Sequence, residues 1–174
     1  IFPLLCWLIP FAAPAQWTPP PVPDTLIQAV EADIWQPFME AYRDYDADKI
    51  MALHTMDIIR VSEKSGTIDM GQPYIDAFGA ALKRWQEEKR VMRIAFSIIN
   101  TSYGSGLVSQ RGYYRISAKE PGDDKIIPRG YSEFNVILRH EAGHWKFMFD
   151  SDRRVEITEE EFQATGLVYE LTGK

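Results

Sequence analysis

Cysteine is almost absent from the sequence. The 174 residues contain one, Cys6, which lies in an apolar N-terminal segment and is not preceded by the small residues of a lipid-attachment site. A chain that begins after this segment has no disulfide framework and no thiol nucleophile. For a chain cut after this segment, we therefore expect neither a disulfide-stapled scaffold nor catalysis by a cysteine.

Positive charge is also scarce. The chain has 19 Lys and Arg residues against 25 Asp and Glu residues, a formal net charge of −6 and a pI of about 5.1. Its charges are mixed, and no basic run or stripe stands out. A nucleic-acid partner needs a clustered basic footprint. We therefore expect no nucleic acid among its partners.

The N-terminus lacks a hydrophobic run long enough for a membrane span. Residues 1–11 are apolar and uncharged but are interrupted by Pro3 and Pro10, and small residues follow from Ala12 to Ala15 in an A-x-A arrangement. This pattern predicts the remainder of a secretory signal peptide over residues 1–15, cut after Ala15. The initiating Met and a charged n-region are missing, so we expect a truncated start. The alternative for this segment is an apolar strand of the fold. The signal peptide predicts that the protein is secreted or periplasmic.

The rest of the chain has the composition of one compact domain, because the sequence is 45% hydrophobic and 13% aromatic. Residues 16–23 (QWTPPPVP) read as a proline-rich spacer. We assign residues 24–157 to the domain and residues 158–174 to a C-terminal tail. In this tail the spacing of Thr158 and Glu161 is that of a capping box, which predicts a short helix.

Helical periodicity dominates the first half of the domain. Apolar residues recur at three- and four-residue steps through residues 24–45, which is typical of a helix with one buried face. Pro37 should kink or divide this helix. A second short helix is expected over residues 47–54, and a third from Gly71 to about residue 87, with Pro73 in its first turn.

The second half alternates with period two, which is typical of strands. Together with a short strand over residues 57–63, the expected strands cover residues 92–98, 107–117, 131–140 and 145–150. Helices that precede a meandering antiparallel sheet bury their apolar faces most simply on one side of it. The sequence thus predicts an α+β domain.

The stretch RHEAGHW contains the pattern H-E-x-x-H at His140 and His144, which is the zinc-binding core of many metallopeptidases. That chemistry requires a helix, so that both imidazoles reach one ion. Here the flanks alternate with period two instead, and Gly143 suits the positive φ of a tight turn. We therefore expect two strands joined by a turn.

The register of this expected hairpin follows from its apolar residues. With Ala142-Gly143 at the centre of the turn, Leu138 pairs with Phe147 and Val136 with Phe149, all on one face. The same register sends His140 and His144 to opposite faces, where they cannot share a metal ion. The sequence predicts no metal site.

Three stretches carry a family resemblance. Residues 42–54 (YRDYDADKIMALH), 70–78 (MGQPYIDAF) and 143–152 (GHWKFMFDSD) stand in an order that resembles the nuclear transport factor 2-like superfamily. This superfamily includes ketosteroid isomerase, the SnoaL-like proteins and bacterial families of unknown function. The resemblance covers about residues 30–152. It implies a cone-shaped fold, in which three N-terminal helices pack on a curved antiparallel sheet and enclose an apolar cavity.

The isomerase chemistry does not transfer with the resemblance. When the chain is aligned on Tyr45 and Asp46, the hydrogen-bonding tyrosine of the isomerase falls on Phe38 and its aspartate base falls on Ser62. A serine without a neighbouring base cannot abstract a proton from carbon. A slip of one residue would restore an acidic group, Glu63. No cofactor is expected.

The resemblance nevertheless indicates which side chains face the cavity. Ser62 and Arg60 lie on the cavity side of their strand, where the arginine would favour a carboxylate or another anionic group. The alternative for Arg60 is that its side chain reaches the rim of the cavity and pairs there with an acidic residue. His54 is the candidate catalytic acid or base, or else hydrogen-bonded packing. Tyr42 and Tyr74 are expected at the mouth. We assign five further aromatic residues to the core or the cavity wall: Trp85, Phe96, Tyr113, Trp145 and Phe147.

Three functions follow as hypotheses. The favoured one is a secreted module that binds a small, partly apolar and anionic molecule. The first alternative is a cofactor-independent isomerase, dehydratase or hydrolase of the same fold. The second alternative is an association domain without a ligand, whose exposed sheet face makes a dimer. A homodimer is the expected assembly.

Overall fold

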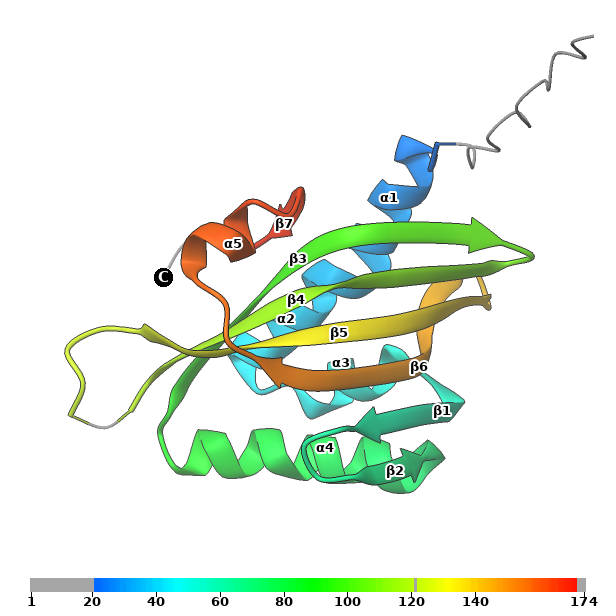
Figure 1. The fold of residues 1–174 in the computed structure, drawn as a ribbon. Coiled ribbons are helices and arrows are strands. Elements are labelled where there is room, and N and C mark those ends of the chain that lie inside the picture. The colour runs from blue at the N-terminus through cyan, green and yellow to red at the C-terminus, as the bar shows by residue number, and fades with distance from the viewer. Residues whose placement is uncertain (1–20, 121, 172–174) are drawn as a thin grey trace, which may run out of the picture.

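The computed structural model describes residues 21–120 and 122–171. The expected signal peptide, and residues 16–20 of the expected spacer, lie outside the described residues. The described chain folds into one curved sheet with the strand order β2-β1-β6-β5-β4-β3-β7, and its first helices cover one face of this sheet (Figure 1). The α+β fold predicted from the sequence is confirmed.

The first predicted helix is divided into three parts. Helix α1 (Asp24–Val30) continues into one π-helical turn, η1 (Glu31–Trp35), and then into α2 (Gln36–Asp44). Pro37 has no N–H group to donate to a carbonyl one turn earlier. The helix therefore widens just before the proline, as π turns do where the regular ladder is interrupted. This turn directs Ile34 and Trp35 into the core, where both are buried.

The second helix ends earlier than the sequence predicts. Helix α3 (Ala47–Ala52) begins at an Asp46 cap, whose side chain accepts a hydrogen bond of 2.9 Å from the Lys49 amide. His54 is the first residue of strand β1 (His54–Ser62) rather than the last of the helix. The chain leaves the helix at Leu53, because the Leu53 carbonyl accepts a hydrogen bond of 2.8 Å from the Phe147 amide.

Strand β2 (Thr67–Met70) was not predicted. It pairs antiparallel with β1 and forms an edge of the sheet. Gly71 then turns the chain into α4 (Gly71–Glu87) with a φ of 59°. A side chain at this position would also place its Cβ 3.1 Å from the Met56 carbonyl oxygen. The glycine expected at the start of the third helix therefore has a conformational reason.

Four long strands form the centre of the sheet. They are β3 (Val91–Gly104), β4 (Leu107–Lys119), β5 (Ile127–Glu141) and β6 (His144–Val155), and consecutive strands pair antiparallel. Strand β1 lies beside β6 and pairs with it in parallel. The sheet is thus antiparallel except at the β1–β6 pair.

The H-E-x-x-H stretch is a β-hairpin, as predicted. Ala142 and Gly143 form its turn with φ values of 53° and 88°, and His140 pairs with Trp145. Two consecutive positive φ angles are the mark of a type I′ turn, whose twist suits a two-residue hairpin. His140 and His144 lie on opposite faces of the hairpin, because they belong to successive cross-strand pairs.

Further along the hairpin the predicted register is wrong by one residue. Leu138 pairs with Phe147, but the next pair joins Ile137 to Phe149, which leaves Met148 as an extra residue in β6. Such a β-bulge reverses the alternation beyond it. Val136 therefore pairs with Asp150 instead of Phe149.

The C-terminal residues close the other end of the sheet. Helix α5 (Glu159–Gln163) begins with the capping box that the sequence predicts at Thr158, and β7 (Leu167–Tyr169) pairs with β3. The fully buried Phe162 of α5 packs against Tyr131 and Arg115. These contacts hold α5 on the sheet face opposite α1–α4.

No helix within residues 21–120 and 122–171 is long and apolar enough to cross a membrane. The five α-helices of these residues pack on the two faces of the sheet (Figure 1).

The hairpin turn provides a test of the register. Ala142 has a left-handed conformation that costs a residue with a Cβ about 1 kcal/mol. We expect Ala142→Asn to stabilise the protein by about 0.5–1 kcal/mol in urea unfolding, because asparagine tolerates this conformation. Gly143→Ala should instead cost about 1–2 kcal/mol. Equal stability of the two variants would contradict the turn.

Candidate functional site

A cavity of about 320 Å³ lies between the helices and the inner face of the sheet. Its walls are mostly aromatic, and three charged side chains lie together in its lining. The lining residues are Trp35, Phe38, Tyr42, Arg60, Tyr74, Ala77, Phe78, Trp85, Ile94, Phe96, Tyr114, Ile116, Phe134, Val136, Phe147, Asp150 and Asp152. This volume is within the usual range for small-molecule sites.

The aromatic wall is held in place by ring contacts and one buried hydrogen bond. The ring centroids of Trp35 and Phe96 are 4.5 Å apart, and those of Phe38 and Phe147 are 5.8 Å apart. The Trp35 indole Nε1 donates a hydrogen bond of 2.8 Å to Oε1 of the buried Gln110. The π turn and strand β4 thus fix the orientation of this wall together.

Arg60, Asp150 and Asp152 form the charged cluster of the cavity. Arg60 comes from β1, and both aspartates come from β6 beyond its bulge. The Arg60 Nη2 atom lies 2.7 Å from Asp152 Oδ1, and its Nη1 atom lies 3.1 Å from Asp150 Oδ2. We call these three residues the acidic cluster, because two carboxyl groups share one guanidinium.

Two tyrosines adjoin the acidic cluster. The Tyr114 hydroxyl donates a hydrogen bond of 2.5 Å to Asp152 Oδ2. Tyr74 reaches the cavity from α4. Burial raises the pKa of the Tyr74 hydroxyl, and the negative charge of Asp150 raises it further. Both hydroxyl groups therefore remain protonated at neutral pH.

The ionisation of Asp150 is displaced toward neutrality. Burial raises the pKa of this carboxyl group from 3.8 to about 6, the Arg60 guanidinium opposes the rise, and Asp152 adds to it. The pKa of Arg60 is lowered by burial but raised overall by Asp150 and other neighbours, so the guanidinium stays charged. A carboxyl group with a pKa near 6 can both take up and release a proton near neutral pH.

The structure brings together three of the five residues expected at the site. Tyr42, Arg60 and Tyr74 line the cavity, whereas His54 and Ser62 do not. Ser62 lies on the same strand face as Arg60, two residues further along β1. Of the two alternatives for Arg60, the pairing with acidic residues is the one observed, and Arg60 lines the cavity as well.

His54 is a buried packing residue in this structure. Its Nδ1 atom lies 2.7 Å from the Ile50 carbonyl oxygen, and its ring lies 5.3 Å from the Phe147 ring. Burial lowers the pKa of His54 to about 4, although the hydrogen bond with Ile50 opposes this change. The imidazole is thus neutral at pH 7. Among the described residues, its only hydrogen bond is the one with the Ile50 carbonyl.

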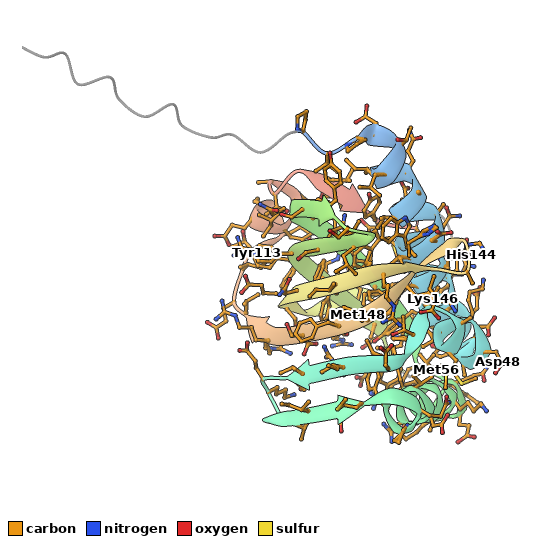
Figure 2. All side chains as sticks on the ribbon, turned by 90° about the vertical axis from the view of Figure 1, so that its right-hand side faces the viewer. Asp48, Met56, Tyr113, His144, Lys146 and Met148 are labelled. Carbon is orange, nitrogen blue, oxygen red and sulfur yellow. The ribbon has the colours of Figure 1, made fainter. Side chains whose placement is uncertain are left out.

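Sequence reasoning missed Asp150, Asp152 and Tyr114. Alternation that continues unbroken from Phe147 places Phe149 inside and both aspartates outside, and nothing in the sequence marks the bulge at Met148. Tyr113 was assigned to the core or cavity wall, which is wrong. It pairs with Ser97 and Glu133 and lies on the sheet side away from helices α1–α4 (Figure 2). Its neighbour Tyr114 is the wall residue.

Comparison of the sequence with protein-family models and with curated proteins found no match. Among solved structures, the chain is similar to ActVI-ORFA from Streptomyces coelicolor, with 14% identity, a TM-score of 0.63 and coverage of 76% of this chain and 99% of that one. Aln2 from another Streptomyces species has 14% identity and a TM-score of 0.62, with coverage of 77% and 93%.

A ketosteroid isomerase-like protein from Erwinia carotovora atroseptica is also similar. It has 14% identity, a TM-score of 0.55, and coverage of 75% of this chain and 96% of that one. Identities this low establish a common fold and leave function open. The chain has the cone-shaped fold of the nuclear transport factor 2-like superfamily, as predicted from the sequence.

The raised pKa of Asp150 predicts how stability depends on pH. The folded state favours the protonated form, so stability from this group is present below about pH 4 and is lost as the pH rises through 6. Asp150→Asn, which mimics the protonated form, should therefore gain stability over the unaltered protein between pH 4 and pH 7.5. The gain is at most about 3 kcal/mol.

Urea unfolding of both proteins at pH 4 and pH 7.5 measures this difference. Because both proteins retain His54, its own titration cancels in the comparison. A difference that stays constant between the two pH values would contradict an Asp150 pKa near 6.

Proposed function

We propose that the cavity binds a small, neutral and largely aromatic molecule with a polar group at one end. The observation that carries the proposal is the combination of an aromatic wall with the acidic cluster in one cavity of about 320 Å³. Aromatic side chains provide large apolar area for planar ligands. A few convergent polar groups then fix the orientation of the ligand.

A neutral ligand fits this site better than the anion expected from Arg60 alone. The guanidinium is already paired with two carboxyl groups, which leaves no net positive charge to attract an anion. With both aspartates ionised the acidic cluster carries one negative charge, and protonation of Asp150 makes it neutral. Burying a further anion beside these carboxylates would be costly.

Proton transfer by Asp150 is the second candidate function. A general base acts best when its pKa is close to the working pH, and burial raises the pKa of Asp150 to about 6. The carboxylate would take a proton from a carbon atom of the ligand and return it at the same or another carbon. Such an enzyme needs no cofactor for this step. It corresponds to the cofactor-independent enzyme kept as the first alternative above.

Two alanines of α4 provide a matched test of binding. Ala77 and Ala80 are both exposed on this helix, but only Ala77 lines the cavity. We expect the neutral fluorescent probe 1-aminoanthracene to bind the unaltered protein. The substitution Ala77→Trp should weaken this binding at least tenfold, a loss of about 1.4 kcal/mol of binding free energy, because the indole occupies the cavity.

The control is Ala80→Trp, which adds the same side chain to the same helix away from the cavity. Its affinity for the probe should match that of the unaltered protein. Equal weakening by both substitutions, or no probe binding at all, would contradict the proposal.

Proton transfer is tested with 2-tetralone in D₂O, by following exchange of its α-protons with NMR. The protein should accelerate exchange, and the rate should rise with pH through about 6 as Asp150 ionises. Asp150→Asn should reduce the rate about 100-fold or more while the variant still binds 1-aminoanthracene. If the exchange rate is unaffected by this substitution, Asp150 does not catalyse the exchange, and ligand binding stands as the function.

Secretion and the homodimer stay predictions. The segment that predicts secretion lies outside the described residues. An apolar row across the outer sheet face, formed by Met70, Ile59, Phe149 and Ile137 in successive strand pairs, supports an association surface there.

A further inference from the structure

The two aspartates of the acidic cluster differ in their contacts. Asp152 is engaged on both oxygens, by Arg60 Nη2 at 2.7 Å and by the Tyr114 hydroxyl at 2.5 Å. Asp150 is contacted only by Arg60 Nη1, which lies 3.1 Å from its Oδ2 atom without hydrogen-bond geometry. Asp150 thus accepts no side-chain hydrogen bond from the described residues.

Asp150 is also the most accessible member of the cluster. Its side chain is 24% exposed, whereas those of Arg60 and Asp152 are each 15% exposed. A carboxyl group that is largely buried but has no donor is costly, because polar groups in such surroundings are normally hydrogen-bonded. The empty acceptor is therefore the position at which a ligand can gain most.

A donor lies in the same cavity as this acceptor. Tyr74 and Asp150 both line the cavity, and the negative charge of Asp150 adds to the effect of burial in raising the pKa of the Tyr74 hydroxyl. The Tyr74 hydroxyl makes no hydrogen bond within the described part of the chain. One free donor and one free acceptor in the same cavity complement a ligand group that both accepts and donates.

A hydroxyl group meets both requirements. A ketone or ether oxygen would accept from Tyr74 but leave the Asp150 carboxylate without a donor, and a carboxylate would be repelled by both aspartates. We infer that the ligand carries a hydroxyl group that donates to Asp150 and accepts from Tyr74, and that Asp152 and Tyr114 are positioning residues that engage Arg60 and keep Asp150 free. This inference rests on the proposed function and adds the chemical class of the ligand.

Three naphthalenes of similar size test the inference by isothermal titration calorimetry at pH 7.5. The probe 2-naphthol donates and accepts, 2-methoxynaphthalene only accepts, and 2-methylnaphthalene does neither. We expect 2-naphthol to bind about tenfold more tightly than 2-methylnaphthalene, because only its hydroxyl group can donate a hydrogen bond to the charged carboxylate. The methoxy probe should gain at most about threefold.

Two outcomes separate this inference from the proposed function. If none of the three naphthalenes binds the unaltered protein, the proposed function fails. If 2-methylnaphthalene binds and 2-naphthol binds no more tightly, the proposed function stands and the hydroxyl inference is overturned.

Asp152→Asn tests the positioning role. Without its second carboxylate partner, Arg60 should pair fully with Asp150, and the preference for 2-naphthol should disappear while 2-methylnaphthalene binds as before. The control is Glu133→Gln, which removes the carboxylate partner of Arg153 outside the cavity and should keep the preference. Should Asp152→Asn fail to fold, Tyr114→Phe removes a contact of the same carboxyl group. A preference retained in the variant that folds would overturn the positioning role.

A pH profile distinguishes positioning from a merely structural role. Asp150 faces Arg60 on β1, Asp152 on its own strand, Tyr74 on α4 and Tyr114 on β4. Near pH 5 the protonated Asp150 becomes a donor, so 2-methoxynaphthalene should gain affinity relative to 2-methylnaphthalene. In Asp152→Asn this gain should move to lower pH, because Arg60 then favours the ionised Asp150. A gain at the same pH in both proteins would leave Asp152 with a structural role only.

Discussion

The extra residue in β6 determines which side chains reach the cavity. Met148 stands opposite the step between Ile137 and Leu138 of β5, and the strand resumes its alternation one residue out of phase. Without this bulge, Phe149 would face the helices and both aspartates would lie on the outer face of the sheet. Asp150 instead reaches the cavity lining, where Arg60 from β1 meets it. The chemistry of the site therefore depends on the local geometry of one strand.

Placing this cluster in an aromatic cavity has an energetic cost. Burial removes hydration from Asp150 that the Arg60 guanidinium does not fully replace, and the pKa of this carboxyl group is raised accordingly. Natural proteins commonly retain groups that lower stability in this way where a function depends on them. The cavity thus combines a rigid aromatic wall, oriented by the bond from Trp35 to Gln110, with a polar group poised for exchange of a proton or a hydrogen bond.

Patterns with a strong local cause predicted the fold well. Alternation around Gly143 gave the hairpin, Pro37 gave the break in the first helix, and the spacing at Thr158 gave a capped helix. The site was harder to predict. Arg60 lines the cavity on the strand face that alternation and the family resemblance together indicated. Met148 is as compatible with regular pairing as with a bulge, so the sequence assigns Asp150 no role. A bulge depends on how several strands fit together, and period-two patterns carry no information about that fit.

The ionisation of Asp150 is the central claim of this account, and it can be measured without any ligand. Carbon-13 NMR of the Asp150 carboxyl resonance, assigned by its loss in Asp150→Asn, follows this group alone as the pH changes. A midpoint near 6 is the result expected for a carboxyl group held in the cavity by the bulge of β6. A midpoint near the ordinary value of 3.8 would mean that the group is solvated, and would contradict the placement of the acidic cluster and the function proposed from it.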